Sequence, residues 1–416
     1  MSDRKQSAVF ASGRIGGLEI RNRLVRSATF EHAATSGGEV SPALEEMHRA
    51  LARGGIGLIV TGIAWVHPRV QAPPLMVRAD QDAFIPSLRR LAAAVHDAAP
   101  DCRTMLQLHH PGRQVATPDD KERMASVLPP AYLSYAQKHP EAPASPEAAP
   151  HILEPVAPSP IFDGLFQRTP RALSLEEIEE IIQAFAEGIR RAQEAGFDGA
   201  QLHAAHGWLL SSFLSPRTNQ RTDLYGGSPE NRTRIVTEIY KRARAKVGDG
   251  FPILIKFNTT DFLPGGTDME EAIRVGRILS ETGFDALEVS GGMWEAVTRT
   301  KEELGWPPVL LPESRTAIRT PGQEAYFLPA AGILKEHTGA TVLSVGGYRS
   351  FNKVEEAVAS GAADFVSLAR PLIRQPDLPR LWYSGKVDRA ACISCNACLP
   401  VGGAAPLSCK AEDRRG

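Results

Sequence analysis

The stretch DGAQLHAAHGWLLSSFLSPRTNQRTDLYGGSPENR, residues 198–232, holds one complete unit of the fold that the sequence predicts. It begins with the short apolar run 199–203, continues through a loop that carries His206 and Trp208, and leads into a helical segment at Pro229. A short apolar run bounded by glycine and polar residues predicts a buried strand. The run ends in His203, so two imidazoles lie just past the strand and can stabilise an oxygen atom on which negative charge develops.

The same unit of buried strand and amphipathic helix recurs along the whole chain. The predicted strands cover residues 24–28, 58–61, 104–108, 199–203, 253–257, 286–289, 341–345 and 364–368. The predicted helices cover residues 42–53, 84–98, 175–195, 229–246, 268–282, 323–338 and 351–360. Strands that are apolar on both faces suit a parallel sheet covered by helices. Eight of them favour a closed (β/α)8 TIM barrel, whose chemistry lies at the carboxyl ends of the strands.

Two long segments interrupt this alternation. Residues 115–172 separate the third and fourth strands and include the proline-rich PEAPASPEAAP at 140–150, and residues 292–322 form a second long loop. We expect the first segment to be an irregular excursion over the barrel mouth. The sequence therefore predicts a barrel domain over residues 1–385 and a short cysteine-rich tail over residues 386–416.

The composition is that of an ordinary globular enzyme. The 416 residues include 47 lysines and arginines against 48 aspartates and glutamates, which gives a formal net charge of −1. This balance gives no reason to expect nucleic acid or an anionic membrane as a partner. The N-terminus has no apolar segment of signal-peptide length, and no run approaches the roughly 18 apolar residues of a membrane span. We therefore expect a cytoplasmic enzyme with a small-molecule substrate.

Cysteines gather near the C-terminus. Cys102 is the single cysteine before residue 392, whereas Cys392, Cys395, Cys398 and Cys409 follow within 25 residues. In an intracellular protein, such a cluster indicates metal binding or redox chemistry more than disulfides.

Short motifs along the chain resemble the Old Yellow Enzyme family, the FMN-dependent NADH:flavin oxidoreductases. They are NRLV (22–25), GLIVTG (57–62), QLHHPGR (107–113), HAAHGW through ENR (203–232), DFLPGGT (261–267), EVSGG (288–292), SVGGY (344–348) and ADFVSLARPL (363–372). Each is short, and their order and spacing along one barrel carry the resemblance. It implies bound FMN, NAD(P)H as co-substrate, and hydride transfer to an activated alkene such as an α,β-unsaturated carbonyl compound.

The resemblance also implies a set of cofactor-binding residues. Gln107 would pair with the pyrimidine edge of the flavin, and Lys256 would lie beside its N1 and O2; a capping amide and a buried ion pair are the alternatives for these two residues. The phosphate would lie at Gly346, Gly347, Ala369 and Arg370. Ser27, Ala28, Thr29 and Gly62 would face the flavin. Phe30 stands where the family often has the Cys or Thr that tunes the ring.

The implied catalytic residues are His203, His206 and Trp208. Two imidazole N–H groups would stabilise the enolate that forms when hydride reaches the β-carbon of an enone. A metal site and a pair of unrelated histidines are the alternatives, although HxxH has no third ligand nearby. The family usually has Tyr where Trp208 stands, and an indole N–H is no practical acid. Another group or water must then give the proton, or the enzyme oxidises an amine or demethylates its substrate instead.

The CISCNAC tail resembles the branch that contains 2,4-dienoyl-CoA reductase and trimethylamine dehydrogenase. In those proteins such a tail ligates a [4Fe–4S] cluster and further flavin and nucleotide domains follow, which we expect to be absent here. The spacing between the second and third cysteines is one residue shorter than in that branch, and so is the spacing before the last. The tail cysteines could therefore hold a [4Fe–4S] cluster, hold zinc or be free thiols. The sequence also leaves open a homo-oligomer and an electron-transfer partner protein. A flavin-free lyase or aldolase on the same barrel is the rival enzyme class.

Overall fold

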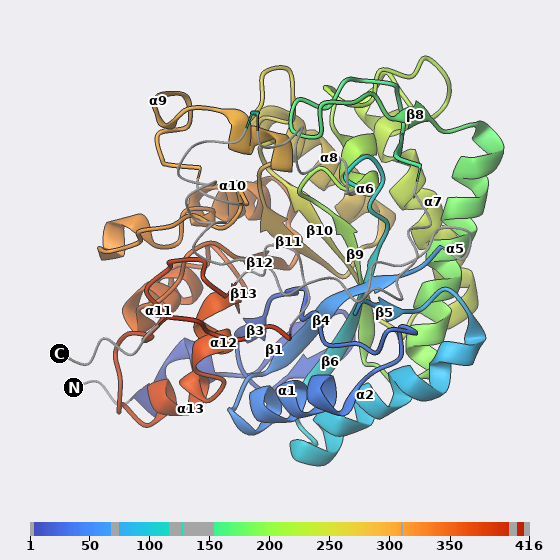
Figure 1. Cartoon of the computed structure of the whole chain (residues 1–416). Helices are drawn as coiled ribbons and strands as arrows, with labels where there is room; N and C mark the ends of the chain where they lie inside the picture. Colours follow the sequence, from blue (N-terminus) through green and yellow to red (C-terminus); the bar gives the residue numbers. More distant parts are fainter. Residues whose placement is uncertain are drawn as a thin grey trace.

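The computed structural model describes residues 4–67, 75–115, 126–127, 154–308, 311–398 and 406–411. Its centre is a closed barrel of eight parallel strands (Figure 1). In chain order they are β3 (Leu24–Arg26), β4 (Leu58–Trp65), β6 (Arg103–His109), β9 (Gly199–Ala204), β10 (Ile253–Asn258), β11 (Ala286–Ser290), β12 (Val342–Ser344) and β13 (Phe365–Leu368). Each strand pairs with the next, and β13 closes the ring on β3. The TIM barrel and all eight predicted strands are thereby confirmed.

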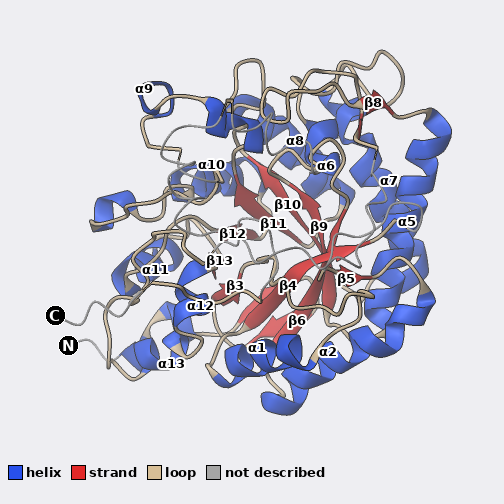
Figure 2. Ribbon diagram, in the orientation of Figure 1, coloured by secondary structure: helices blue, strands red, loops and turns tan. Residues whose placement is uncertain are grey.

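Helices enclose the barrel on its outside (Figure 2). The seven predicted helices appear as α1 (Pro42–Arg53), α2 (Ile85–Ala98), α5 (Leu175–Glu194), α7 (Pro229–Val247), α8 (Met269–Thr282), α10 (Leu328–Thr338) and α11 (Phe351–Ala359). Short helices α6 (Leu209–Leu214), α9 (Lys301–Leu304), α12 (Arg370–Arg374) and α13 (Leu378–Tyr383) add to them. Serine or aspartate side chains cap several starts, among them the capping box of Ser174 and Glu177 on α5.

One helix boundary differs clearly from the prediction. The helix expected over residues 323–338 begins at Leu328, and Pro321–Gln323 form a separate 3-10 turn. Pro329 explains the difference, because proline has no N–H and its ring excludes the helical position of the carbonyl four residues earlier. Ala325 has a φ of 56°, which is outside the right-handed helical region.

The barrel interior changes from apolar to polar along the strands. Because successive side chains of a strand point to opposite faces, every second residue points inward. The lower layer is fully buried and apolar: Val25, Leu58, Val60, Met105, Leu254, Ala286, Leu343 and Phe365. Two positions further along five of the strands, the inward residues are Ser27, Gln107, Gln201, Lys256 and Glu288. The carboxyl ends of the strands therefore carry the polar groups of the interior.

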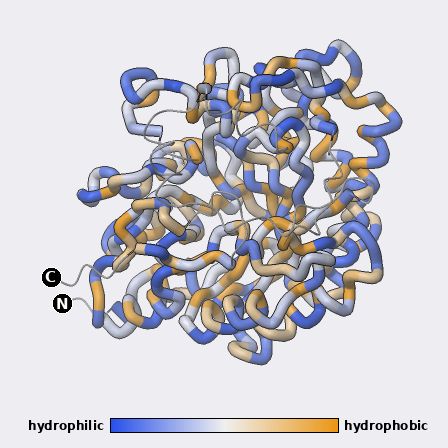
Figure 3. Tube along the Cα trace, viewed as in Figure 1, coloured by the Kyte–Doolittle hydropathy of each residue, from blue (hydrophilic) through white to orange (hydrophobic). Residues whose placement is uncertain are grey.

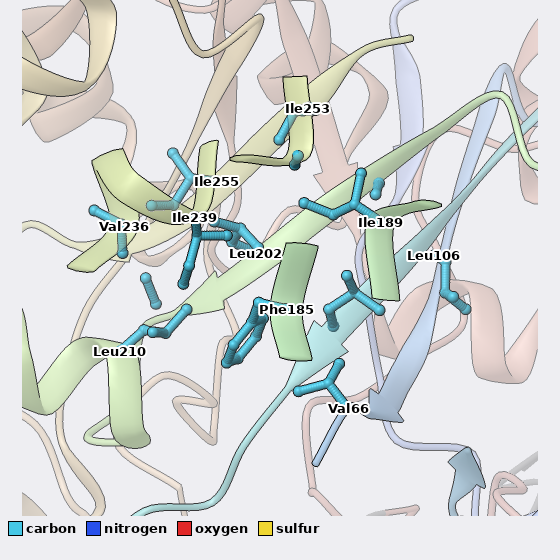
Figure 4. Close-up of a cluster of buried hydrophobic side chains, with 14 of the residues drawn as sticks. Val66, Leu106, Phe185, Ile189, Leu202, Leu210, Val236, Ile239, Ile253 and Ile255 are labelled. Atoms are coloured by element: carbon cyan, nitrogen blue, oxygen red, sulfur yellow. The ribbon is translucent and has the colours of Figure 1, made fainter. Parts of the chain in front are cut away.

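The outer face of the barrel packs on the helices. Figure 4 shows Phe185 and Ile189 of α5 lying over Leu202 of β9, with Ile239 of α7 beside them. All of these side chains are inaccessible to solvent. In Figure 3 the hydrophobic residues follow the central strands, and hydrophilic residues cover the outer turns of the helices. The hydrophobic effect of this cluster, and of a second one that includes Leu51 of α1, Val354 of α11 and Trp382 of α13, holds the helices on the barrel.

A hairpin that the sequence analysis missed closes the lower end of the barrel. Strands β1 (Gly13–Ile15) and β2 (Leu18–Ile20) pair antiparallel through the turn Gly16-Gly17. A Gly-Gly pair between apolar residues is a hairpin signal, because the turn needs positive φ angles; Gly16 has a φ of 55°. Ile15 and Ile20 are fully buried against the lower apolar layer.

The first long insertion has a described part that packs on the barrel mouth. Strands β7 (Val156–Ala157) and β8 (Arg171–Ala172) pair parallel, and β5 (Val77–Arg78) joins the end of β4. Arg113 and Asp163 form a buried ion pair at 2.9 Å that links the insertion to the loop after β6. The proline-rich segment 140–150 lies outside the described residues. No helix in the part of the chain that the structure describes has both the length and the hydropathy of a membrane span.

We predict that Ile20→Ala lowers the free energy of unfolding by about 2–5 kcal/mol, because it leaves a cavity under the apolar layer of the barrel. Urea unfolding followed by circular dichroism measures the change. Ile333→Ala, which truncates a 36% exposed isoleucine on α10, is the matched control and should cost much less. Equal losses in the two variants would show that the hairpin does not seal the core.

Candidate active site

A chain of hydrogen bonds crosses the upper interior of the barrel. The Gln107 Nε2 group donates to Gln201 Oε1 at 2.8 Å, and Gln201 Nε2 donates to Glu288 Oε2 at 2.8 Å. The other carboxylate oxygen of Glu288 accepts from Ser27 Oγ at 2.7 Å. Lys256 Nζ donates to Ser27 Oγ at 2.9 Å and lies 3.4 Å from Glu288 Oε1. All five side chains are buried, so each charge has a partner where water has no access.

Strand register explains why these groups meet. Lys256 lies opposite both His203 of β9 and Glu288 of β11, and Gln107 of β6 lies opposite Gln201 of β9. Register partners of parallel strands point to the same face, so the inward positions converge. The ion pair that the sequence analysis left as an alternative for Lys256 is present, and the Gln107 amide is held by a neighbouring strand.

Three imidazoles form the next layer toward the barrel mouth. The rings of His203 and His206 are 5.1 Å apart, and His109 of β6 lies 5.5 Å from His203. His206 Nε2 is 2.7 Å from Ser290 Oγ of β11. His203 Nδ1 and His109 Nδ1 are buried without a hydrogen-bond partner among the described residues. A buried donor or acceptor without a partner is costly, so these two atoms are candidates for hydrogen bonds to a bound molecule.

The backbone of His206 adopts a conformation that non-glycine residues rarely take. Its φ is 65°, and several hydrogen bonds hold it there. Asn258 Oδ1 accepts from the His206 amide at 3.1 Å, and Gln114 Nε2 donates to the His206 carbonyl at 2.8 Å. Strained backbone of this kind persists where surrounding contacts fix it, and it concentrates at functional sites.

The three imidazoles are neutral because they are buried. Burial lowers the pKa of His203 well below its usual value, and the neighbouring His206 and Lys256 lower it further. The pKa of His206 is lowered by burial, then by Lys256 and His109. The pKa of His109 is lowered by burial and by His203. Each neutral ring carries one N–H donor, so the site offers neutral donors beside the Lys256–Glu288 pair.

Aromatic rings form one side of this site. Trp208, the residue before α6, contacts His109 edge-on with the ring centroids 4.6 Å apart. On its other side Trp208 contacts Trp294 at 4.6 Å. The indole of Trp208 is 6.3 Å from the His203 ring. The structure therefore brings together the three residues predicted to be catalytic, and it places His109 and Trp294 beside them.

A carboxyl group from the second long loop lies beside His206. Glu313 Oε1 is 3.8 Å from His206 Nδ1, and Glu313 Oε2 is buried without a hydrogen-bond partner among the described residues. Burial raises the pKa of Glu313 to about 7, although its own backbone amide and the charges of Lys256 and Arg370 lower it. Glu313 therefore exchanges a proton in the neutral range.

The predicted phosphate position lies after β12 and β13. Gly346 and Gly347 have φ angles of 126° and 75°, which favour glycine. A Cβ on Gly347 would lie 2.6 Å from the Tyr326 ring, so no side chain fits there. Ala369 precedes α12, and Arg370 begins it. Arg370 Nη1 donates to the Arg315 carbonyl at 2.8 Å, which links the phosphate position to the second long loop.

The residues after β3 lie at the same end of the barrel. Ser27 joins the buried hydrogen-bond chain, and Thr29 Oγ1 donates to the Ser27 carbonyl at 3.1 Å. Ala28 packs against the apolar layer below. The rings of Phe30 and His32 contact each other in a tilted arrangement, with the ring centroids 3.6 Å apart.

The backbone of Gly62 is already engaged near these residues. Its amide donates to Glu31 Oε1 at 3.0 Å, and Glu31 also pairs with Arg26 at 2.9 Å. A Cβ on Gly62 would overlap the Glu31 carboxylate. Gly62 therefore has a structural reason to be glycine that is independent of a cofactor.

The tail cysteines gather beside Arg370. Cys392, Cys395 and Cys409 all influence the pKa of Cys398, which burial raises to about 12. Arg374 Nη1 donates to Cys409 Sγ at 3.4 Å. None of the four cysteines forms a disulfide. Within the described ranges, no three His, Cys, Asp or Glu side chains are arranged to hold a metal ion.

The sequence analysis missed Gln201, Glu288, Glu313 and His109. The first two could have been found from the alternation of side chains along a strand. Gln201 stands two residues before His203, and Glu288 stands two residues after Ala286, so each shares the inward face of its strand with that residue. His109 is likewise two residues after Gln107 on β6. Glu313 carries no local signal, since it lies in a loop without periodicity.

The structure is an α/β barrel with buried polar groups at the carboxyl ends of its strands, and comparison with known proteins identifies the family. A model of the NADH:flavin oxidoreductase / NADH oxidase family matches residues 8–388. The chain belongs to this family, which confirms the class expected from its motifs.

Individual relatives agree with this assignment. The chain is 35% identical over 390 residues to an NADH oxidase of Thermoanaerobacter brockii, and the match covers 93% of this chain and 52% of that protein. A structure of 2-naphthoyl-CoA reductase with 2-naphthoyl-CoA superimposes with a TM-score of 0.77 at 27% identity, over 94% of this chain and 54% of the other. The old yellow enzyme homologue of Zymomonas mobilis shares the fold, with a TM-score of 0.67 at 23% identity over 92% and 94% of the two chains. The chain spans about half the length of the first two relatives.

We predict that Glu288→Leu lowers the free energy of unfolding by about 3–5 kcal/mol, because it leaves the Lys256 ammonium buried without its counter-charge. The double variant Lys256→Met/Glu288→Leu removes both charges and should recover most of that loss. Urea unfolding of the wild type, both single variants and the double variant gives the coupling energy. Additive losses would show that the two side chains do not act as a pair.

Proposed function

We propose that this protein is an FMN-dependent NAD(P)H oxidoreductase that reduces activated alkenes such as α,β-unsaturated carbonyl compounds. The observation that carries the proposal is the pair of buried neutral imidazoles, His203 and His206, at the carboxyl ends of the barrel strands. Membership of the NADH:flavin oxidoreductase family supports the cofactor and the nicotinamide. Because several relatives are about twice as long, the activity of the whole protein, its substrate and its partners are parts of this proposal.

The residues at the rim fit the chemistry of FMN. The Gln107 amide and the Lys256 ammonium suit the carbonyls and nitrogens of the flavin pyrimidine ring. Gly346 and Gly347 leave their backbone bare at the position where TIM barrels bind phosphate, and Arg370 supplies a cation there. Ser27, Ala28, Thr29, Gly62 and Ala369 complete the set that we propose for the cofactor. When bound, FMN supplies two-electron chemistry by accepting hydride from NAD(P)H and releasing it to a substrate.

The two histidines would act on the substrate oxygen. Hydride addition to the β-carbon of an enone moves the electron pair of the double bond toward the carbonyl oxygen. Donors fixed in advance at that oxygen stabilise the developing charge more than they stabilise the substrate. Because the two rings are neutral and buried, their N–H groups act in a site of low dielectric constant, where such hydrogen bonds are strongest.

Trp208 and Trp294 would shape the same substrate space. Their rings and that of His109 form a continuous aromatic surface beside the histidines. Flat, conjugated molecules match such a surface, because aromatic rings favour stacked and edge-to-face contacts. The arrangement favours conjugated alkenes over saturated amines. Amine oxidation or demethylation stays the second candidate, supported by Trp208 in place of the usual Tyr.

Mixing experiments test the proposal. We expect the purified protein to be yellow and NADH or NADPH to bleach its flavin without oxygen, and cyclohexenone should then restore the colour. His203→Ala/His206→Ala should keep FMN and its reduction by nicotinamide but lose phenol charge-transfer binding and slow the enone step by about 10²-fold or more. Anaerobic stopped-flow absorbance measures each step. A flavin that neither nicotinamide reduces would rule out the enone reductase, and a colourless protein would rule out every flavin function.

We also propose that the cysteine-rich tail over residues 386–416 binds a [4Fe–4S] cluster that relays electrons to or from the flavin, with zinc as the alternative. The spacing CxxCxxC followed by a fourth cysteine supports a metal, and so does the mutual influence of the four thiols. Against it stands the absence of a ligating arrangement among the described residues. An electron-transfer partner, self-association and a cytoplasmic location belong to the same proposal.

Metal analysis decides the question of the tail. Protein purified without oxygen should contain about four iron and four sulfide per chain, and Cys395→Ser should lose them while keeping FMN. A zinc content of one per chain would replace the cluster by a structural site. If neither metal is present, the tail cysteines are free thiols.

A further inference from the structure

We propose that Glu313 is the general acid of the reductive reaction, the group that gives the substrate its proton in place of the Tyr that Trp208 replaces. This inference rests on the proposed enone reduction and adds a residue that the chain's motifs do not indicate. The observation behind it is the gap between two side chains from different parts of the barrel. Glu313 Oε1 and His206 Nδ1 face each other at 3.8 Å.

That distance is too long for a direct hydrogen bond, but it is short enough for both side chains to hydrogen-bond the same atom of a ligand. An oxygen at about 2.8 Å from each atom completes a triangle with ordinary hydrogen-bond lengths. A carbonyl oxygen bound by His206 would therefore lie within reach of the Glu313 carboxyl. The α-carbon of an enone is two bonds from that oxygen, so the same carboxyl lies close to the atom that needs the proton.

The environment of the second carboxyl oxygen of Glu313 is further evidence for a ligand next to His206. Glu313 Oε2 is buried and has no hydrogen-bond partner among the described residues. His203 Nδ1, on a ring whose centre lies 5.1 Å from that of His206, is also buried without a partner among the described residues. Unpaired buried polar atoms are costly unless a bound molecule satisfies them. The Glu313 side chain is 16% exposed, which leaves a route for its reprotonation from solvent.

The charged and titratable groups around Glu313 set its protonation. Lys256 and Arg370 face it from β10 and α12 and favour the carboxylate, whereas burial favours the neutral acid and dominates. His206 faces it from the loop after β9 and is neutral. Tyr326, in front of α10, feels the charges of Arg370, Arg315 and Glu313 and keeps its proton because burial raises its pKa. With a pKa of about 7, Glu313 is close to the ideal for an acid that works near neutral pH.

Hydrogen bonds to three consecutive backbone carbonyls hold the Glu313 loop in place. Tyr326 Oη donates to the Glu313 carbonyl at 2.6 Å, and Asn396 Nδ2 donates to the Ser314 carbonyl at 2.6 Å. Arg370 Nη1 donates to the Arg315 carbonyl at 2.8 Å. The three donors come from three separate segments of the chain. Such a clamp fixes the carboxyl with the accuracy that proton transfer requires.

The Arg315 side chain adds a second anchor. Its guanidinium carbon lies 4.4 Å from the centre of the Tyr326 ring and 4.9 Å from that of Trp306. Cation–π contacts of this kind are worth about 0.5–2 kcal/mol each. The loop around Glu313 is therefore packed on both sides, and its carboxyl is not a mobile surface group.

The proton balance of the step is simple. Hydride derived from NAD(P)H forms the new C–H bond at the β-carbon, and the double-bond electron pair forms an enolate whose oxygen accepts hydrogen bonds from His203 and His206. The pair then returns to the α-carbon, which takes the proton from the Glu313 carboxyl. Glu313 is left as a carboxylate, and solvent restores its proton. One hydride and one proton are consumed for each alkene reduced.

The experiment separates this step from the rest of the reaction. In Glu313→Gln we expect the reoxidation of reduced enzyme by cyclohexenone to slow by about 10²-fold. Flavin reduction by NAD(P)H and reoxidation by ferricyanide, which need no proton at carbon, should continue. The rate of the enone step in the wild type should fall as pH rises through about 7, because the acid must be protonated. This falling limb of the pH–rate profile should be absent in Glu313→Gln.

Matched variants make the result specific. Glu302→Gln removes an exposed carboxyl from the same long loop and should leave every step unchanged. Glu313→Asp keeps the acid and should keep the pH limb. Trp208→Tyr in the Glu313→Gln background restores a phenol donor and should recover part of the enone rate.

A readout without turnover completes the test. The wild-type protein should show an infrared band of a protonated carboxyl that disappears as pH rises through about 7, and Glu313→Gln should lack it. A wild type that reduces enones while Glu313→Gln does so equally fast would overturn the role of Glu313. A wild type that reduces no enone although nicotinamide bleaches its flavin would overturn the proposed function instead.

Discussion

The buried ion pair between Lys256 and Glu288 is the constraint on which the rest of the site depends. A lysine inside a barrel is tolerable when its charge is balanced, and the balance here comes from the next strand. Ser27 Oγ donates to Glu288 Oε1, the same oxygen that faces Lys256, and Gln201 Nε2 donates to Oε2. Four strands are thereby fixed to one another at the level where the apolar core ends. His203 stands two residues after Gln201 on β9, and His109 stands two residues after Gln107 on β6, so the strands fix both imidazoles above this layer. His206 follows in the loop after β9.

That pair also sets the electrostatics of the rim. A lone lysine would present a full positive charge to any ring bound above it, whereas a lysine beside a carboxylate presents a dipole. The distance of 3.4 Å between the charged atoms allows partial compensation, with Ser27 between them. Bound flavin in this barrel would therefore feel less positive charge at its pyrimidine edge than Lys256 alone suggests. Lower positive charge there favours the oxidised flavin and makes the reduced form a stronger hydride donor.

The sequence predicted the barrel well because its physical signals are local. Buried strands are short apolar runs, and the caps and prolines that begin helices act over one turn, so α1 has the predicted bounds. Period-two alternation would also have found Gln201, which shares an inward face with His203, and Glu288, which stands two residues after Ala286, the start of its strand. The shift of α10 to Leu328 has a local cause, Pro329, that the periodicity alone did not reveal.

The part that sequence could not provide is the loop geometry. Glu313 reaches His206 only because Tyr326, Arg370 and Asn396 hold three successive carbonyls from distant points of the chain. Such a contact has no period, no spacing and no motif. The same contact also connects the tail to the barrel, because Asn396 lies between Cys395 and Cys398. Its Oδ1 accepts a hydrogen bond from Arg370 Nη1 at 2.5 Å. Through this one amide side chain the tail contacts both Arg370, at the predicted phosphate position, and the loop that carries Glu313. The cysteine-rich tail is then part of the construction of the candidate active site.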